Sequence, residues 1–169
     1  MPTLFITCGL SGTGKSTVAK IVSEITGAEV IRSDVVRKEL AGISPEKHSY
    51  VSFNTGIYSG EFTKKTYQRM TELASDYLKS GRDVLLDATF TKRWQRDMAR
   101  NLAESLNTGF KCLVVTCPEE VVIERLRNRM MDGKDVSDGR EEIYFAQKRS
   151  YEPPDEIPPE NIIEISLPG

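Results

Sequence analysis

The sequence has few of the residues that mark disulfide-stabilised or metal-binding proteins. Its 169 residues include three cysteines and a single histidine. Cys8, Cys112 and Cys117 have no metal-like spacing, and their odd number does not favour a disulfide framework. Cys8 and Cys112 lie in strand-like runs, so we expect buried free thiols and a reducing, cytoplasmic setting. His48 falls in a polar segment and is not expected to take part in catalysis.

Long apolar runs and a strong net charge are also missing. No run approaches the ~20 apolar residues of a membrane-spanning helix. Residues 2–8 predict a core strand, and no basic segment precedes them as in a signal peptide. The formal net charge of −2 does not favour a protein that coats nucleic acid. We expect one domain over residues 1–169 with no membrane partner, and the oligomeric state stays open.

Short apolar runs alternate with longer segments of helical periodicity along the chain. This alternation is typical of an α/β fold with a mainly parallel sheet. The predicted strands span residues 3–8, 28–32, 83–88, 110–116 and 161–165. The predicted helices span residues 15–26, 35–40, 57–79, 92–107, 118–131 and a segment that ends near 150. Helix 92–107 carries, at near-helical spacing, Trp94, Met98, Leu102 and Leu106.

The most informative motif is G-x-x-x-x-G-K-S at residues 9–16, directly after the first predicted strand. Its glycines let the backbone curl so that several N–H groups point at one anion, and the helix that follows adds its positive dipole end. Lys15 can reach the β- and γ-phosphates, and Ser16 can offer its hydroxyl to Mg²⁺. This setting predicts a phosphate-binding loop. The residues expected to bind ATP are Gly9, Ser11, Gly12, Thr13, Gly14, Lys15, Ser16 and Thr17.

Polar residues follow two further strands, at the sheet edge where ligands bind in parallel α/β folds. Asp34 and Arg37, three residues apart, share a helix face after strand 28–32. Asp34 can accept the proton of an attacking hydroxyl while Arg37 holds the acceptor. The alternative is a helix cap, Ser33 or Asp34, with a surface ion pair. Asp87 lies near the end of strand 83–88, where it is predicted either to bind Mg²⁺ or to start a turn.

Four arginines are further candidates. Arg93 and Arg96 open helix 92–107, where they can bind a phosphate or carboxylate of the acceptor or form a solvated face. Arg125 and Arg129 can neutralise a transferring phosphoryl group or stack on a base, or lie on an exposed helix. Like charges four apart destabilise a helix by roughly 0.2–0.5 kcal/mol, which favours an anion between them. The polar segment at about 130–140 is expected to act as a short lid.

These motifs follow one another through nearly the whole chain. They are the loop at 9–17, R-S-D-V-V-R-K-E-L-A-G at 32–42, D-V-L-L-D-A-T-F at 83–90, R-x-x-x-R at 125–129 and Q-x-x-x-Y-E-P-P at 147–154. In this order they resemble the small P-loop kinases of the zeta-toxin, polynucleotide-kinase and gluconate-kinase group. More narrowly, the chain resembles the AAA-type ATP-binding kinases that also occur fused to an aminoglycoside-phosphotransferase-like domain.

The resemblance implies a three-layer α/β/α P-loop NTPase fold, like a nucleoside kinase with a short lid. It implies five parallel strands in the order 2-3-1-4-5, with ATP–Mg²⁺ as donor and a hydroxyl as acceptor. Asp34 falls on the aspartate base of polynucleotide kinases and zeta toxins, and Arg37 falls on their acceptor-binding position. Arg125 and Arg129 resemble the base-stacking and phosphate-binding arginines of nucleotide kinases.

We therefore predict an ATP- and Mg²⁺-dependent kinase that phosphorylates a hydroxyl of a small molecule. The predicted catalytic residues are Lys15, Asp34, Arg37, Arg125 and Arg129, and Arg125 also contacts the nucleotide. The predicted acceptor-binding residues are Asp34, Arg37, Arg93 and Arg96, and the predicted metal ligands are Ser16 and Asp87.

Two other functions stay open. One is a polynucleotide 5′-hydroxyl kinase, which the Asp34–Arg37 pair and a basic cluster favour; the cluster consists of Lys92, Arg93, Arg96 and Arg100. The other is a nucleotide-dependent regulatory module with weak ATPase activity, although such a module needs no base. The sequence does not distinguish ATP from GTP.

Overall fold

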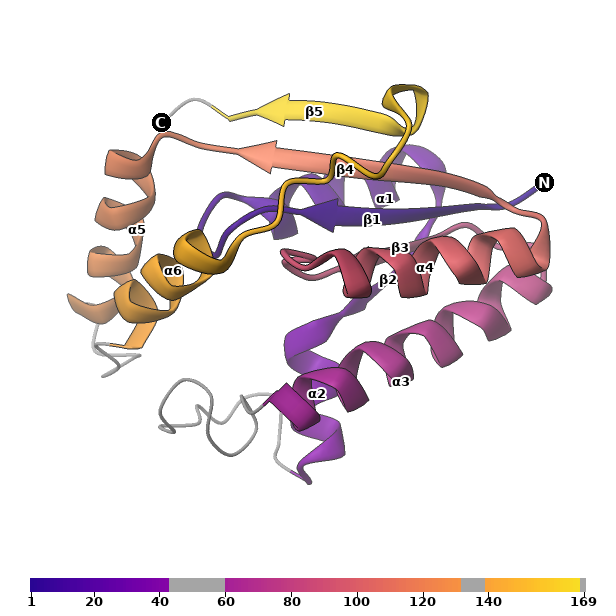
Figure 1. Ribbon diagram of the computed structural model, residues 1–169, viewed down its shortest axis with the longest axis horizontal. Helices are drawn as coiled ribbons and strands as arrows, with labels where there is room; N and C mark the ends of the chain where they lie inside the picture. The colour runs from indigo at the N-terminus through magenta and orange to yellow at the C-terminus, as the bar shows by residue number, and fades with distance from the viewer. Residues whose placement is uncertain (43–59, 132–138, 168–169) are drawn as a thin grey trace.

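The computed structural model describes residues 1–42, 60–131 and 139–167 (Figure 1). The strands are β1 (Thr3–Cys8), β2 (Glu29–Arg32), β3 (Val84–Asp87), β4 (Gly109–Thr116) and β5 (Ile162–Ser166). The helices are α1 (Lys15–Thr26), α2 (Ser33–Leu40), α3 (Gly60–Lys79), α4 (Arg93–Leu106), α5 (Glu119–Met131) and α6 (Gly139–Ser150). His48, the start of the helix predicted at 57 and most of the predicted lid lie outside the described residues.

The five strands form one parallel sheet in the order β2-β3-β1-β4-β5. The central strand β1 pairs on one side with β3, where Leu4 lies opposite Val84, and on the other side with β4, where Leu4 lies opposite Phe110. The predicted α/β class and strand order are therefore confirmed. Because every strand runs the same way, their carboxyl ends meet at one edge of the sheet (Figure 1).

The helices cover both faces of this sheet, which gives three layers. Helix α1 packs on one face, against β1, β2 and β3, while α3 and α4 pack on the other (Figure 1). Strand β1 shows the division: Leu4 and Ile6 are fully buried in the α3–α4 core, and the alternate residue Phe5 packs into the α1 core. Burial on both faces explains why the inner strands β1 and β3 are nearly continuous apolar runs.

The boundaries of helices α1 and α2 depend on the residues beside them in different ways. Helix α1 ends before Gly27, whose φ of +75° is the left-handed conformation that favours glycine, as expected. The expected side-chain cap of α2 is wrong: Ser33 and Asp34 are already helical, and the cap position is Arg32, without a side-chain cap bond. None of the helices in residues 1–42, 60–131 and 139–167 is long and apolar enough to cross a bilayer.

Helices α5 and α6 pack together beyond the carboxyl ends of the strands (Figure 1). Their shared core contains Val122 and Leu126 of α5 and Tyr144 of α6, with Leu10 from the loop after β1 packed against it. This contact fixes the two helices beside the phosphate-binding motif, and the fold therefore places α6 at the same sheet edge as the ends of β2 and β3.

Candidate functional site

The loop after β1 has the backbone of an anion-binding turn. Gly12 and Gly14 have φ values of +81° and +101°, which residues with a Cβ rarely adopt. A Cβ on Gly9 would lie 2.6 Å from the carbonyl oxygen of Val115, so that position also needs glycine. Helix α1 begins at Lys15 without a side-chain cap and has no acidic residue in its first turn. Its first N–H groups therefore remain available to a bound anion.

Side chains brace this loop from within and from α5. The amine of Lys15 donates to the Leu10 carbonyl at 2.8 Å, and the Thr13 hydroxyl donates to the same oxygen at 2.8 Å. Arg125 of α5 donates from Nη1 to the Gly12 carbonyl at 3.3 Å. Two cationic side chains, from α1 and α5, thus lie against the loop that the sequence assigns to phosphates.

Ser16 and Asp87 meet where β3 ends. The Ser16 hydroxyl donates to Oδ2 of Asp87 at 2.9 Å, and the Asp87 side chain is only 6% exposed. Arg32 Nε lies 3.8 Å from the same carboxylate oxygen. Two hard oxygen ligands side by side fit Mg²⁺, which uses one or two protein oxygens together with nucleotide phosphates and water. The described residues contain no cluster of three or more metal-binding side chains, so a cage made by protein alone is absent there.

Asp34 and Arg37 line a cavity of about 720 Å³ that Ser11 of the phosphate-binding loop also lines. Asp34 accepts hydrogen bonds from Nη2 of Arg32 at 3.0 Å and from the Val35 N–H at 2.8 Å. Arg37 donates to the Thr63 hydroxyl of α3 at 3.0 Å. The structure therefore brings both residues predicted after β2 to one cavity with the loop.

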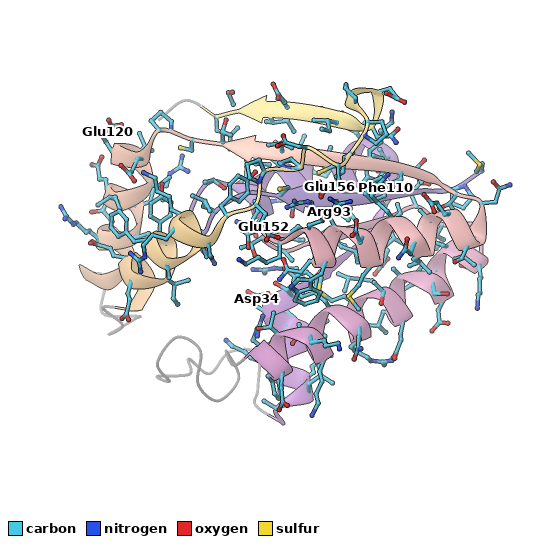
Figure 2. All side chains as sticks on the ribbon, in the orientation of Figure 1. Asp34, Arg93, Phe110, Glu120, Glu152 and Glu156 are labelled. Carbon is cyan, nitrogen blue, oxygen red and sulfur yellow. The ribbon has the colours of Figure 1, made fainter. Side chains whose placement is uncertain are left out.

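The cavity draws its walls from parts of the chain that are far apart in sequence. They come from α2, α3, the turn after β3, the start of α4 and the last turns of α6. Figure 2 shows Asp34 on α2, across from Glu152, which follows α6. A ligand that fills this space would contact α2, α6 and the phosphate-binding loop.

Arg96 is a correction to the predicted acceptor site. Its side chain is completely buried and does not line the cavity. Nε pairs with Glu156 at 2.6 Å, Nη1 donates to the Phe90 carbonyl at 2.8 Å, and Nη2 donates to the Pro153 carbonyl at 3.2 Å. Burial lowers the pKa of Arg96, but the hydrogen bond with Glu156 and the charges of neighbouring groups, Glu156 among them, raise the pKa overall. Arg96 therefore holds protein segments together instead of facing a ligand.

The turn that Arg96 holds is strained. Phe90 has a φ of +46°, an unusual value for a bulky residue. Its carbonyl is bound by Arg96, and its N–H donates to the Tyr67 hydroxyl at 3.2 Å. Burial raises the pKa of Tyr67, which therefore stays a neutral phenol. The strained turn presents Thr89 to the cavity, and the Thr89 carbonyl accepts the Gly9 N–H at 3.0 Å.

Arg93 also does not line the cavity. Its side chain is 66% exposed, with Nε 3.6 Å from Asp97, while its backbone N–H donates to Glu152 at 2.7 Å (Figure 2). The basic cluster predicted around it is divided. Lys92 donates to the Ser150 carbonyl at 2.7 Å, Arg96 is buried, and Arg100 donates to the Glu156 carbonyl at 3.3 Å. These four cations do not form one continuous basic surface.

Of the two arginines predicted on α5, Arg125 reaches the loop as described, and the Arg129 side chain lies outside the described residues.

Sequence reasoning missed Trp94, Gln147 and Arg149, which all line the cavity. Gln147 of α6 accepts the Ser11 N–H at 2.9 Å, so it joins the cavity wall to the loop. The Q-x-x-x-Y-E-P-P motif that begins at Gln147 was the available signal.

Known proteins share this sequence pattern and fold. A family model described as an AAA domain matches residues 4–154. An uncharacterized protein of Mycobacterium tuberculosis is 31% identical over 129 residues, which cover 76% of this chain. The chain spans about a quarter of that relative, 26% of its length.

Two solved structures share the fold across almost the whole chain. Chaetomium thermophilum Kti12 in complex with ADP-AlF3 has a TM-score of 0.69 at 16% identity, over 98% of this chain and 88% of that one. A gluconokinase from Sinorhizobium meliloti has a TM-score of 0.66 at 20% identity, over 98% and 83%. With the family match over most of its length, the chain belongs to the AAA domain family.

Proposed function

We propose that the protein is a kinase that transfers the γ-phosphate of ATP, with Mg²⁺, to a hydroxyl group of a small molecule. The observation that carries this proposal is the shared cavity. Ser11 of the phosphate-binding loop and the candidate base Asp34 line the same space of about 720 Å³. A phosphate donor on the loop and a hydroxyl acceptor beside Asp34 would therefore lie next to each other.

The donor would bind along the start of α1. The N–H groups of residues 12–17 would hold the phosphates, with the amines of Lys15 and Arg125 as countercharges. Ser16 and Asp87 would hold the magnesium ion, which supplies charge neutralisation for the phosphates. A cleft of about 500 Å³ at the ends of β4 and β5 would take the base, and it is lined by Thr116, Cys117, Pro118, Ser166 and Leu167.

The acceptor would bind in the cavity on the other side of the loop. Asp34 would accept the proton of the attacking hydroxyl, and Arg37 would orient the acceptor from the same helix. In phosphoryl transfer, positioning and charge neutralisation supply most of the rate, so a preformed cavity beside the donor loop suits the reaction. The segment at 130–140 would act as a lid, and residues 1–169 as one kinase domain.

Two observations favour a small acceptor over a polynucleotide 5′-hydroxyl. The predicted basic cluster does not form one surface: Arg96 is buried, and Lys92 and Arg100 donate to the backbone carbonyls of Ser150 and Glu156. In addition, one of the proteins with this fold is a gluconokinase, named for a small acceptor. The regulatory alternative would show ATP hydrolysis without transfer.

The test is a transfer assay with γ-labelled ATP, Mg²⁺ and panels of hydroxyl compounds and 5′-hydroxyl oligonucleotides. We expect labelled product from a small molecule and none without Mg²⁺. Slow ATP hydrolysis across every panel would support the regulatory alternative. Labelled oligonucleotide, with binding that weakens steeply as salt rises, would support the polynucleotide alternative.

A further inference from the structure

The acceptor cavity carries a charge opposite to that of the whole protein. Among the described residues that line it, four side chains are cationic, namely Arg37, Lys38, Lys92 and Arg149. Asp34 is the one carboxylate in the same described lining, although the chain as a whole has a net charge of −2. Positive groups concentrated in a cavity with low-dielectric walls attract anions more strongly than the same groups spread over a surface.

Two of these cations, Lys92 and Arg149, lie close to the end of α6. Lys92 donates to the Ser150 carbonyl, which is an uncharged acceptor. Arg149 is exposed on the last turn of α6, and no carboxylate of the described residues lies within ion-pair distance of it. A guanidinium in this position can bind a carboxylate or a phosphate through two parallel hydrogen bonds.

Trp94 adds an apolar surface to the cavity. It is the chain's single tryptophan, and 41% of it is exposed although it lies at the start of a packed helix. Its ring meets Tyr67 edge-on, with centroids 5.7 Å apart and an angle of 70° between the planes. An exposed aromatic ring in a ligand cavity offers a stacking surface for a flat ring or for the CH groups of a sugar.

We propose that the acceptor is an anionic hydroxyl compound, a small molecule with a carboxylate or phosphate group, that contacts Arg149 through this group and Trp94 through its ring or carbon chain. This inference rests on the proposed kinase function of the same cavity. A small molecule fits because the volume of about 720 Å³ is that of a small-ligand site. A polynucleotide would instead need a basic groove that follows its backbone.

The first experiment measures acceptor binding without phosphoryl transfer, by calorimetry on the full chain with an unreactive ATP analogue. The probes are three matched pairs: gluconate and sorbitol, glucose 6-phosphate and glucose, and uridine 5′-monophosphate and uridine. We expect the charged member of at least one pair to bind tenfold or more tightly, the effect of one charge-assisted contact. The first pair tests a carboxylate, and the other two test a phosphate.

The second experiment asks whether Arg149 and Trp94 cause this preference. In Arg149→Met the ratio of charged to neutral binding should fall roughly tenfold. In Trp94→Leu both members of a pair should bind roughly tenfold more weakly while their ratio is kept. The matched controls are Arg69→Met on α3 and Phe145→Leu on α6, two exposed residues outside the described cavity lining, and both ratio and affinity should stay unchanged.

The outcomes separate this inference from the kinase proposal. Arg149-dependent anion binding without any phosphorylated product would support the anion site and reject the kinase. Phosphorylation of the neutral members as fast as the charged ones would support the kinase and reject the anion site. The inference also fails if every charged probe stays unbound at millimolar concentration, or if an oligonucleotide binds in their place with steep salt dependence.

Discussion

The donor loop and the acceptor cavity are built in opposite ways, although they share one sheet edge. The donor loop is a consecutive stretch, residues 9–17, and it works through backbone N–H groups and glycine conformations. The acceptor cavity collects side chains from residues between Ser11 and Ser150. A site made of backbone is specified locally and has little freedom to change its ligand. A site made of distant side chains can change its ligand through single substitutions. In the proposed kinase, the loop would therefore be the part common to the family, and the cavity would set the substrate.

The largest expected effect comes from removing the base on the acceptor side while the donor side is left intact. Asp34→Asn should lower turnover by roughly 10²–10⁴-fold, because a placed general base contributes about that factor. ATP affinity should stay nearly constant, and calorimetry beside steady-state transfer kinetics checks both. Asp76→Asn, at an exposed position of α3, is the matched control. Full turnover in Asp34→Asn would remove this residue from the mechanism.

The next effect tests the scaffold behind the acceptor cavity. Arg96→Met should lower the free energy of unfolding by about 3–5 kcal/mol, because Glu156 would stay buried without its cation. Urea unfolding measures the change, and the double variant with Glu156→Gln should recover part of it. Arg93→Met, which removes an exposed pair with Asp97, should change stability by about 0.5 kcal/mol or less. Equal losses of unfolding free energy in Arg96→Met and Arg93→Met would contradict the assignment of Arg96 to the core.

On the donor side, Lys15→Ala should weaken ATP binding by roughly ten- to a hundredfold, the effect of losing charge-assisted contacts to phosphate. Turnover should fall as well, in contrast to the selective effect of Asp34→Asn. Calorimetric titration with ATP measures the affinity. Lys20→Ala, at an exposed position of the same helix, should bind ATP as the unchanged protein does. An unaltered titration in Lys15→Ala would refute the phosphate-binding assignment.

The smallest effect concerns the proposed metal ligands. Ser16→Ala removes a neutral oxygen beside Asp87, so the Mg²⁺ concentration for half-maximal activity should rise about fivefold. Chelation of Mg²⁺ with EDTA should stop transfer in both proteins. Ser105→Ala, an exposed serine of α4, serves as the control. A Mg²⁺ requirement that does not change in Ser16→Ala would show that its hydroxyl is not a ligand.

The parts of the molecule that depend on neighbours in sequence were predictable. The glycine spacing predicted the loop and the start of α1 at Lys15, and the short apolar runs predicted all five strands with each end within one residue. The strand order was predicted from the resemblance to small P-loop kinases, because the alternation of apolar runs with helical segments predicts only a mainly parallel sheet. The Asp34–Arg37 pair was also within reach, because its spacing puts both on one helix face after β2.

Helix α4 shows why the rest was not predictable. Its larger apolar residues suggested a stripe that includes Trp94, whereas the buried residues are Gln95, Arg96, Ala99 and Ala103. Small alanines let the helix approach the sheet closely, while Met98, Leu102 and Leu106 are only partly buried. The partner of Arg96 lies 60 residues away, and Gln147 lies 136 residues from Ser11. No local pattern indicates such pairings, which depend on how the fold closes.

The hydrogen bond from the Gly9 N–H to the Thr89 carbonyl connects the donor loop directly to the wall of the acceptor cavity. Gly9 opens the donor loop, and Thr89 lines the acceptor cavity. An acceptor that displaces the turn at Thr89 would therefore alter the loop, and a nucleotide that tightens the loop would alter the turn. Thermodynamic reciprocity requires the two influences to be equal in size, so the factor by which the first substrate improves affinity for the second also holds in the reverse order of addition.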